Sequence, residues 1–224
     1  MRKLYVSNKD ETIRMFKSNF FEAFSKVHFS VPLIIYLPVI GYFLYLSFVS
    51  SSLTLLSGLA YFGLGLLIWT VTEYILHRYI FHFEPKGKIG QRLHFIFHGV
   101  HHDYPNDSLR LVMPPSVSIP LAFLFYFSFR SILPGDALYP FFAAFVLGYL
   151  AYDMLHYAIH HVNMKGKWWV ALKTHHLKHH FKDPDKGYGV SSPLWDVIVG
   201  SNFKKGSEKA APKKRALETS ESSH

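Results

Sequence analysis

The chain has 224 residues, of which half are hydrophobic and 17% are charged, and its formal net charge is +9. This charged fraction is below the ~25% that is typical of soluble domains. The chain has 15 histidines and no cysteine, so disulfides, zinc–thiolate sites and iron–sulfur clusters are excluded and a bound metal needs His, Asp or Glu ligands. Aromatic and basic residues are not interleaved as nucleic-acid binding would require, so no nucleic-acid partner is predicted.

Residues 1–30 are polar and charged, and we expect a cytosolic N-terminal segment without a cleaved signal peptide. Four apolar stretches follow, each close to the ~20 residues needed to cross a bilayer. They cover residues 31–49, 53–76, 116–133 and 137–155. The last stretch, 203–224, is polar, and we expect a disordered tail.

The connections between the apolar stretches predict the topology. Residues 50–52 and 134–136 are too few for anything but tight turns, so the four spans form two hairpins that open on one side of the membrane. The side on which the hairpins open would receive residues 1–30, 77–115 and 156–224. These segments contain all of the 24 Lys and Arg except Arg130. Because basic residues stay in the cytoplasm, both termini are predicted to be cytoplasmic. The prediction is an all-α, multi-pass integral membrane protein with four transmembrane helices in two hairpins and a cytosolic His-rich helical cap.

Histidines gather in four groups on the predicted cytoplasmic side, and only His28 and His224 stand apart. The groups are His77 and His82; His94, His98, His101 and His102; His156, His160 and His161; and His175, His176, His179 and His180.

Helical spacing places several of these rings on common faces. His98, His101 and His102 stand at i, i+3 and i+4, and His176, His179 and His180 repeat this triangle. His156 and His160 form an i, i+4 pair. His77 and His82 diverge by about 140° on a regular helix, and they converge only if the helix ends or bends near Tyr79.

So many imidazoles on one membrane face would repel one another if protonated, whereas neutral imidazole is the usual metal ligand. Eight or more ligands exceed a tetrahedral zinc site and suffice for two ions. Imidazole suits Zn, Cu, Fe and Ni alike, and a redox reaction on lipid needs iron to activate O₂. Asp153 and Glu73 each lie one turn before a histidine, where they either orient a ring N–H or make helix-end hydrogen bonds or salt bridges.

The order of the clusters resembles the fatty acid hydroxylase superfamily, and most closely its fatty acid 2-hydroxylase branch, which is associated with ceramide. The stretches "HGVHHDYPNDSLRLVMPP" and "HHLKHHFKDPDKGYGVSSPLWDVIVG" carry this resemblance within residues 60–202. The resemblance implies a membrane hydroxylase domain over residues 31–202, two iron ions, O₂ as oxidant and hydroxylation of an acyl chain at C2. The implied metal ligands are His77, His82, His98, His101, His102, His156, His160, His176, His179 and His180.

Many members of this superfamily carry an N-terminal cytochrome domain with a His-Pro-Gly-Gly motif, which does not occur in this sequence. We therefore expect a separate electron-transfer protein as the external donor. Zinc is expected to be able to replace iron in purified protein. His94, His161 and His175 are predicted to support the site or to lie at the membrane interface.

The expected substrate is a lipid acyl chain, free or linked to a sphingolipid. Metals above the helix ends would lie near the depth of an acyl carbonyl, which favours attack at C2. The segment 162–174 is predicted to lie along the membrane surface, anchored by Trp168 and Trp169. Asp103, Asn106 and Asp107 are loop-forming residues or supports of the site.

Several alternatives remain open from the residues alone. A sterol or carotenoid hydroxylase and a lipid desaturase share the same histidine clusters. A bis-histidine haem protein requires facing histidines inside the spans, and a metal transporter requires ionisable residues at mid-span. A zinc hydrolase requires no electrons.

Overall fold

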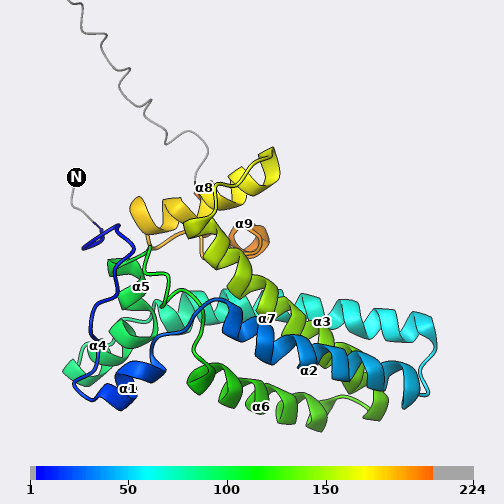
Figure 1. Ribbon diagram of the computed structural model, residues 1–224. Coiled ribbons are helices and arrows are strands. Elements are labelled where there is room, and N and C mark those ends of the chain that lie inside the picture. The colour runs from blue at the N-terminus through cyan, green and yellow to red at the C-terminus, as the bar shows by residue number, and fades with distance from the viewer. Residues whose placement is uncertain (1–3, 204–224) are drawn as a thin grey trace, which may run out of the picture.

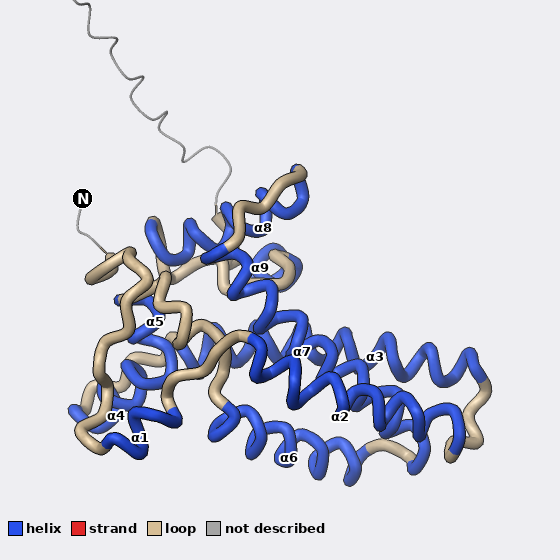
Figure 2. Tube along the Cα trace, viewed as in Figure 1, coloured by secondary structure: helices blue, strands red, loops and turns tan. Residues whose placement is uncertain are grey.

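The computed structural model describes residues 4–203, and these form helices and loops without a strand (Figure 2). Residues 204–224, which make up almost all of the predicted tail, lie outside the described residues. Four helices are long and apolar enough to span a membrane, which confirms the predicted all-α membrane fold. They are α2 (Ser30–Val49), α3 (Leu55–Ile75), α6 (Pro115–Ile132) and α7 (Leu138–His161).

Short elements form a cap at one end of these spans (Figure 1). They are α1 (Asn19–Phe24), the π-helix η1 (Leu76–Phe81), α4 (Lys88–His94), the π-helix η2 (Phe95–Gly99), α5 (Val100–Asp103), α8 (Lys167–Phe181) and α9 (Leu194–Val199). One further element, the 3₁₀-helix η3 (Gly135–Ala137), belongs to the turn between α6 and α7 at the opposite end.

The two hairpin turns lie side by side. The Asp136 carboxylate accepts hydrogen bonds from the Ser52 N–H at 2.7 Å and from the Ser52 hydroxyl at 2.9 Å. Since both turns are at one end of the molecule, both hairpins open towards the cap, as the sequence predicts.

Helix α7 is the internal helix of the bundle. Within the apolar stretch of this span, 72% of the residues are buried, against 17% or less in the corresponding stretches of the other three spans. It packs most extensively against α3 and α2 and less against its hairpin partner α6. Most apolar side chains of α2, α3 and α6 therefore lie on the outside of the bundle, where they would face lipid.

Close approach of α3 to α7 depends on two glycines. A Cβ at Gly65 would collide with the carbonyl oxygen of Phe141, and a Cβ at Gly148 would collide with the ring of Trp69. Because α3 continues into η1 with His77 and α7 ends with His156, His160 and His161, this contact also sets how far apart those histidines lie.

The N-terminal segment is tied to the loop after α5. The Arg110 guanidinium contacts the Glu22 carboxylate at 2.9 Å and donates to the Ile13 carbonyl at 2.6 Å. The Thr12 hydroxyl donates to the Asp107 carboxylate at 2.6 Å, and the Asn106 amide donates to the Asn8 carbonyl. Asp107 and Asn106 thus hold the N-terminal segment against the cap.

We predict that Gly65→Ala destabilises the fold by roughly 1–3 kcal/mol, because the added methyl group overpacks the α3–α7 contact. Gly63→Ala is the matched control on the same helix, since a Cβ there meets nothing within 4 Å. Thermal unfolding in detergent measures both variants. Equal midpoints for the two would contradict the close packing of α3 on α7.

Candidate metal centre

His77 and His82 converge because the end of α3 widens into a π-helix. The N–H of His82 donates to the carbonyl of His77 at 3.1 Å, which is the i→i+5 bond of a π-turn. The two ring centroids are 5.0 Å apart. The bend that the sequence required near Tyr79 is therefore this π-turn.

Three further helical segments bring the remaining rings together. His98 lies in η2, and His101 and His102 lie in the helix α5 that continues from it. His156 and His160 occupy the last turns of α7, which runs six residues beyond the predicted span end at 155. The third segment, α8, crosses the cap above them and supplies His176, His179 and His180 (Figure 1).

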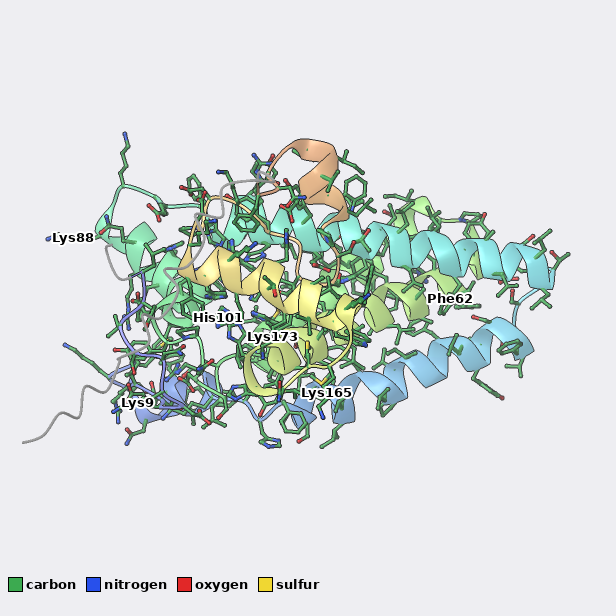
Figure 3. The ribbon with its side chains drawn as sticks, turned by 90° about the horizontal axis from the view of Figure 1, so that it is seen from above. Lys9, Phe62, Lys88, His101, Lys165 and Lys173 are labelled. Atoms are coloured by element: carbon green, nitrogen blue, oxygen red, sulfur yellow. The ribbon has the colours of Figure 1, made fainter. Side chains whose placement is uncertain are left out.

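These ten histidines form two compact groups of five. In each group the nearest ring nitrogens all lie within 4.8 Å of one another, and neither group contains a carboxylate. The first group is His77, His82, His98, His102 and His179, and the second is His101, His156, His160, His176 and His180. In Figure 3, His101 lies at the cap end of the molecule, away from Phe62 in α3.

Each predicted triangle of histidines is divided between the two groups. In α5, His102 contributes to the first group and the neighbouring His101 to the second. In α8, His179 joins the first group, whereas His176 and His180, one turn apart, join the second. Both helices therefore connect the two groups and fix their separation.

In the first group, ring nitrogens face one another at very short range. The Nε2 atom of His98 lies 3.1 Å from the Nε2 atoms of both His77 and His102. The Nε2 atoms of His82 and His179 are 3.0 Å apart.

Backbone carbonyls fix the tautomer of two of these rings. The Nδ1–H of His77 donates to the carbonyl of Tyr188, and that of His179 donates to the carbonyl of Lys186 at 2.7 Å. A neutral imidazole that carries its proton on Nδ1 has a lone pair on Nε2. The carbonyls thus direct two lone pairs towards the centre of the first group.

The second group holds buried nitrogens that lack a hydrogen-bond partner within the described residues. They include Nε2 of His101, His156 and His160. A buried polar atom without a partner is costly, and three such atoms in one group fit a cation as the missing partner. The donor set of both groups therefore fits a metal site.

Burial keeps these rings neutral. Loss of solvation, followed by the charges of His179 and His102, lowers the pKa of His82 to about 2. Loss of solvation likewise lowers the pKa of His179 to about 4. The same cause holds the pKa well below its usual range in His98, His101, His102, His176 and His180. Neutral rings are the form that binds metals.

The three additional histidines lie outside both groups. The ring of His161 stacks on Tyr157, with centroids 4.7 Å apart. His175 contacts the Asp196 carboxylate at 3.0 Å through its Nε2 atom. His94 lies beside Gly99, one turn before His98 of η2.

Glu73 and Asp153 hold backbone segments. Glu73 accepts hydrogen bonds from the N–H groups of Val190 at 2.8 Å and Ser191 at 2.9 Å, and also from the Ser191 hydroxyl. Asp153 accepts the N–H of Met113 at distances of 3.4 and 3.5 Å. Glu73 thus fixes the loop whose Tyr188 carbonyl orients His77.

Asp196 is a support of the site that the sequence analysis did not find. It is fully buried and accepts the N–H groups of Tyr188 at 3.0 Å and Gly189 at 2.8 Å. It therefore fixes the same loop from the α9 side. The signal available in the sequence was the pair of glycines around Tyr188, which marks a tight loop shortly after the histidine-bearing helix α8.

Comparison with known proteins agrees with this geometry. Residues 62–201 match the family model described as fatty acid hydroxylase. The chain is 38% identical to dihydroceramide fatty acyl 2-hydroxylase FAH1 of Arabidopsis thaliana, over 84% of this chain and 79% of that protein. It is 39% identical to fatty acid 2-hydroxylase of Rattus norvegicus, over 83% of this chain and 55% of the rat protein. The chain thus spans only about half the length of the rat relative.

A solved structure is also similar. The hydroxylase domain visible in full-length scs7p superposes with a TM-score of 0.78 at 35% identity, over 83% of this chain and 70% of that chain. The family model and the relatives define an oxidoreductase of lipid metabolism, and the four apolar helices and the histidine groups support a membrane-bound, metal-binding protein. The chain belongs to the fatty acid hydroxylase family.

We predict that the metal-free fold loses stability as the pH falls below about 6.5, the pKa of histidine in an unfolded chain. In the window from 6.5 down to the folded-state pKa values, about 4 for His179 and about 2 for His82, the unfolded chain binds more protons than the folded one. Stability therefore falls with falling pH. Thermal unfolding of chelator-treated protein at about pH 7.5 and about pH 5.5 measures this. An unchanged or higher midpoint at the lower pH would contradict the neutrality of the rings.

Proposed function

We propose that this protein is a membrane di-iron hydroxylase that inserts one oxygen atom of O₂ at C2 of a fatty acyl chain, free or linked to a sphingolipid. The observation that carries the proposal is the pair of all-histidine groups at the cap ends of α3 and α7. Residues 31–202 would form the hydroxylase domain. Among the alternatives, the 2-hydroxylase reading is favoured because the relatives are named fatty acyl and fatty acid 2-hydroxylases.

Each histidine group would hold one iron ion, with the ten histidines listed above as ligands. Zinc would occupy the same imidazoles in protein purified without iron, because imidazole does not discriminate between the two metals. Glu73 and Asp196 would act as positioning residues, since they fix the loop that orients His77. Asp153 would act in the same way on the segment around Met113.

When bound, iron would supply the activation of O₂ and the cleavage of the C–H bond. Overall, one C–H bond of the acyl chain is replaced by C–OH, and the second oxygen atom leaves as water. The balance requires two electrons and two protons for each O₂. We propose that a separate electron-transfer protein delivers the electrons. The protein itself binds and orients the acyl chain.

The metal centre and both termini would face the cytoplasm. This orientation is supported by the Lys and Arg within residues 4–203, all of which except Arg130 belong to segments on the cap side of the spans. Lys9 and Lys88 lie at the cap end in Figure 3, away from Phe62 in α3.

The position of the histidines favours C2 as the site of attack. They lie where α3 and α7 leave the membrane, which is the depth at which a bilayer lipid carries its acyl carbonyl. The carbon next to the carbonyl would then be closest to the metals, while the tail remains among the spans. A mid-chain carbon would have to be drawn up into the cap.

An apolar cleft between α2 and α6 has the size and lining for the tail. It has a volume of about 500 Å³ and is lined by residues that include Val39, Phe123 and Phe142. It adjoins a smaller cavity of about 40 Å³ that is lined by Leu76 and Met113. Leu76 directly precedes His77, so the smaller cavity reaches towards the first histidine group.

Ala122 lines both cavities and marks their junction. A tail that extends away from the metals would pass this residue before it enters the larger cleft. The side chain at position 122 would therefore set how long an acyl chain fits.

We predict that cells expressing the wild type accumulate 2-hydroxyacyl lipids and that cells expressing His98→Ala do not, because Nε2 of His98 lies at the centre of the first group. Mass spectrometry of cell lipids with fragmentation to locate the hydroxyl measures this. His28→Ala is the matched control, because His28 is exposed and bonds to Ser30 away from both groups. A hydroxyl at mid-chain, or product from His98→Ala at the wild-type level, would contradict the proposal.

We also predict that Ala122→Phe shifts the 2-hydroxy products towards shorter acyl chains, with a severalfold loss of the longest ones, because the ring closes the junction of the two cavities. Leu124→Phe is the control on the same helix, since Leu124 is 60% exposed and lines neither cavity. The chain-length profile of the products is the readout. An unchanged profile in Ala122→Phe would show that the tail takes another route.

A further inference from the structure

The segment that contains α9 runs alongside a membrane-spanning helix. The indole N–H of Trp195 donates to the Thr70 hydroxyl at 3.1 Å, and the hydroxyls of Tyr74 and Ser201 are 2.7 Å apart. Thr70 and Tyr74 both belong to the candidate span Leu55–Phe81. In Figure 1, α9 lies next to α3 and beneath α8.

The contact with Thr70 places α9 below the level of the histidines. Thr70 precedes His77 by seven residues, which corresponds to about 10 Å along a helix at 1.5 Å per residue. A helix held at this level beside α3 cannot lie in bulk water if α3 spans the bilayer. Its outward surface is therefore at the depth of the lipid.

The outward surface of α9 is apolar. Leu194, Val197, Ile198 and Val199 are 47%, 61%, 61% and 47% exposed. Helix α3 also carries exposed apolar side chains near this contact in sequence, with Leu67 and Ile75 at 48% and 46% exposed. Both helices thus carry exposed apolar side chains, which is the character of a lipid-facing region rather than of a soluble one.

The inward surface of α9 carries the support of the metal centre. Asp196 points into the protein, where it accepts the N–H groups of Tyr188 and Gly189 and contacts His175. Within one short helix, the apolar residues face outwards and the single carboxylate faces the loop that orients His77. This division is that of an amphipathic helix at a membrane interface.

We propose that α9 is an in-plane membrane-anchoring helix whose Leu194, Val197, Ile198 and Val199 insert into the bilayer leaflet on the cap side. Its partner is the acyl region of the lipid beside α3. The inserted helix also links the bilayer to the Asp196-bound loop, so that the metal centre is held at a fixed depth relative to the bilayer.

Site-directed spin labelling tests this directly, because the chain has no native cysteine. The full chain would be reconstituted in phospholipid nanodiscs with a nitroxide on Ile198→Cys or, as a second position on the same face, on Leu194→Cys. Leu67→Cys on α3 serves as the lipid-facing control and Lys88→Cys on the exposed side of the cap as the aqueous control. The measured quantity is the accessibility of each nitroxide to molecular oxygen relative to a water-soluble nickel chelate.

We expect the ratio of oxygen to nickel accessibility at positions 194 and 198 to exceed that at Lys88→Cys severalfold and to approach that at Leu67→Cys. A ratio equal to that at Lys88→Cys would place α9 in water and overturn the proposal. Low accessibility to both reagents would show that protein covers the helix, and this would overturn it as well. Neither readout depends on catalytic activity, so the result is independent of the proposed reaction.

Discussion

Ten closely packed imidazoles, seven of them buried, can lie in contact with one another only if they are uncharged. In water most histidines are close to half protonated near pH 6.5, and ten positive charges within two small groups would disrupt the cap. Burial excludes the protons, but it leaves ring nitrogens facing one another with lone pairs and few donors. A metal cation in each group would relieve this conflict, and the folded cap and the proposed metal centre would then depend on the same set of contacts.

The rest of the fold serves to bring these rings to one place. Helix α7 is buried between its neighbours and ends in His156 and His160, while α3 ends in the π-turn that carries His77. The close contact at Gly65 and Gly148 sets the distance between the two helix ends. The cap then closes over them through α8, whose histidines contribute to both groups.

Much of this arrangement follows from the sequence because its signals are local. Apolar runs of the right length predicted the four spans, and tight turns around Ser52 and Asp136 predicted two hairpins that open on one side. The spacing of the histidines placed several rings on common helix faces, whereas the set of ten ligands was implied by the resemblance to the fatty acid hydroxylase superfamily. The division of each triangle between two groups was not predictable, because it depends on how α5 and α8 cross the ends of α3 and α7. The π-turn after α3 was foreseen only as a required bend.

The supports of the site were harder to predict because they act across long sequence separations. Glu73 was expected either to orient a ring or to make a helix-end hydrogen bond or salt bridge, and its partners are the backbone N–H groups of Val190 and Ser191, which are distant in sequence. Asp196 gave no signal of its own, because a single aspartate in a short apolar segment resembles any helix residue. Its role appears only when α9 is placed beside α3 and the loop around Tyr188 is closed between them.

The most direct test of the account is the metal content of the purified, active protein. After anaerobic reconstitution with ferrous iron and removal of loosely bound metal, the account predicts two iron ions per chain, measured by elemental mass spectrometry. It further predicts that His101→Ala, which alters only the second group, retains close to one iron ion per chain. Fully active protein that contains no metal would contradict the account.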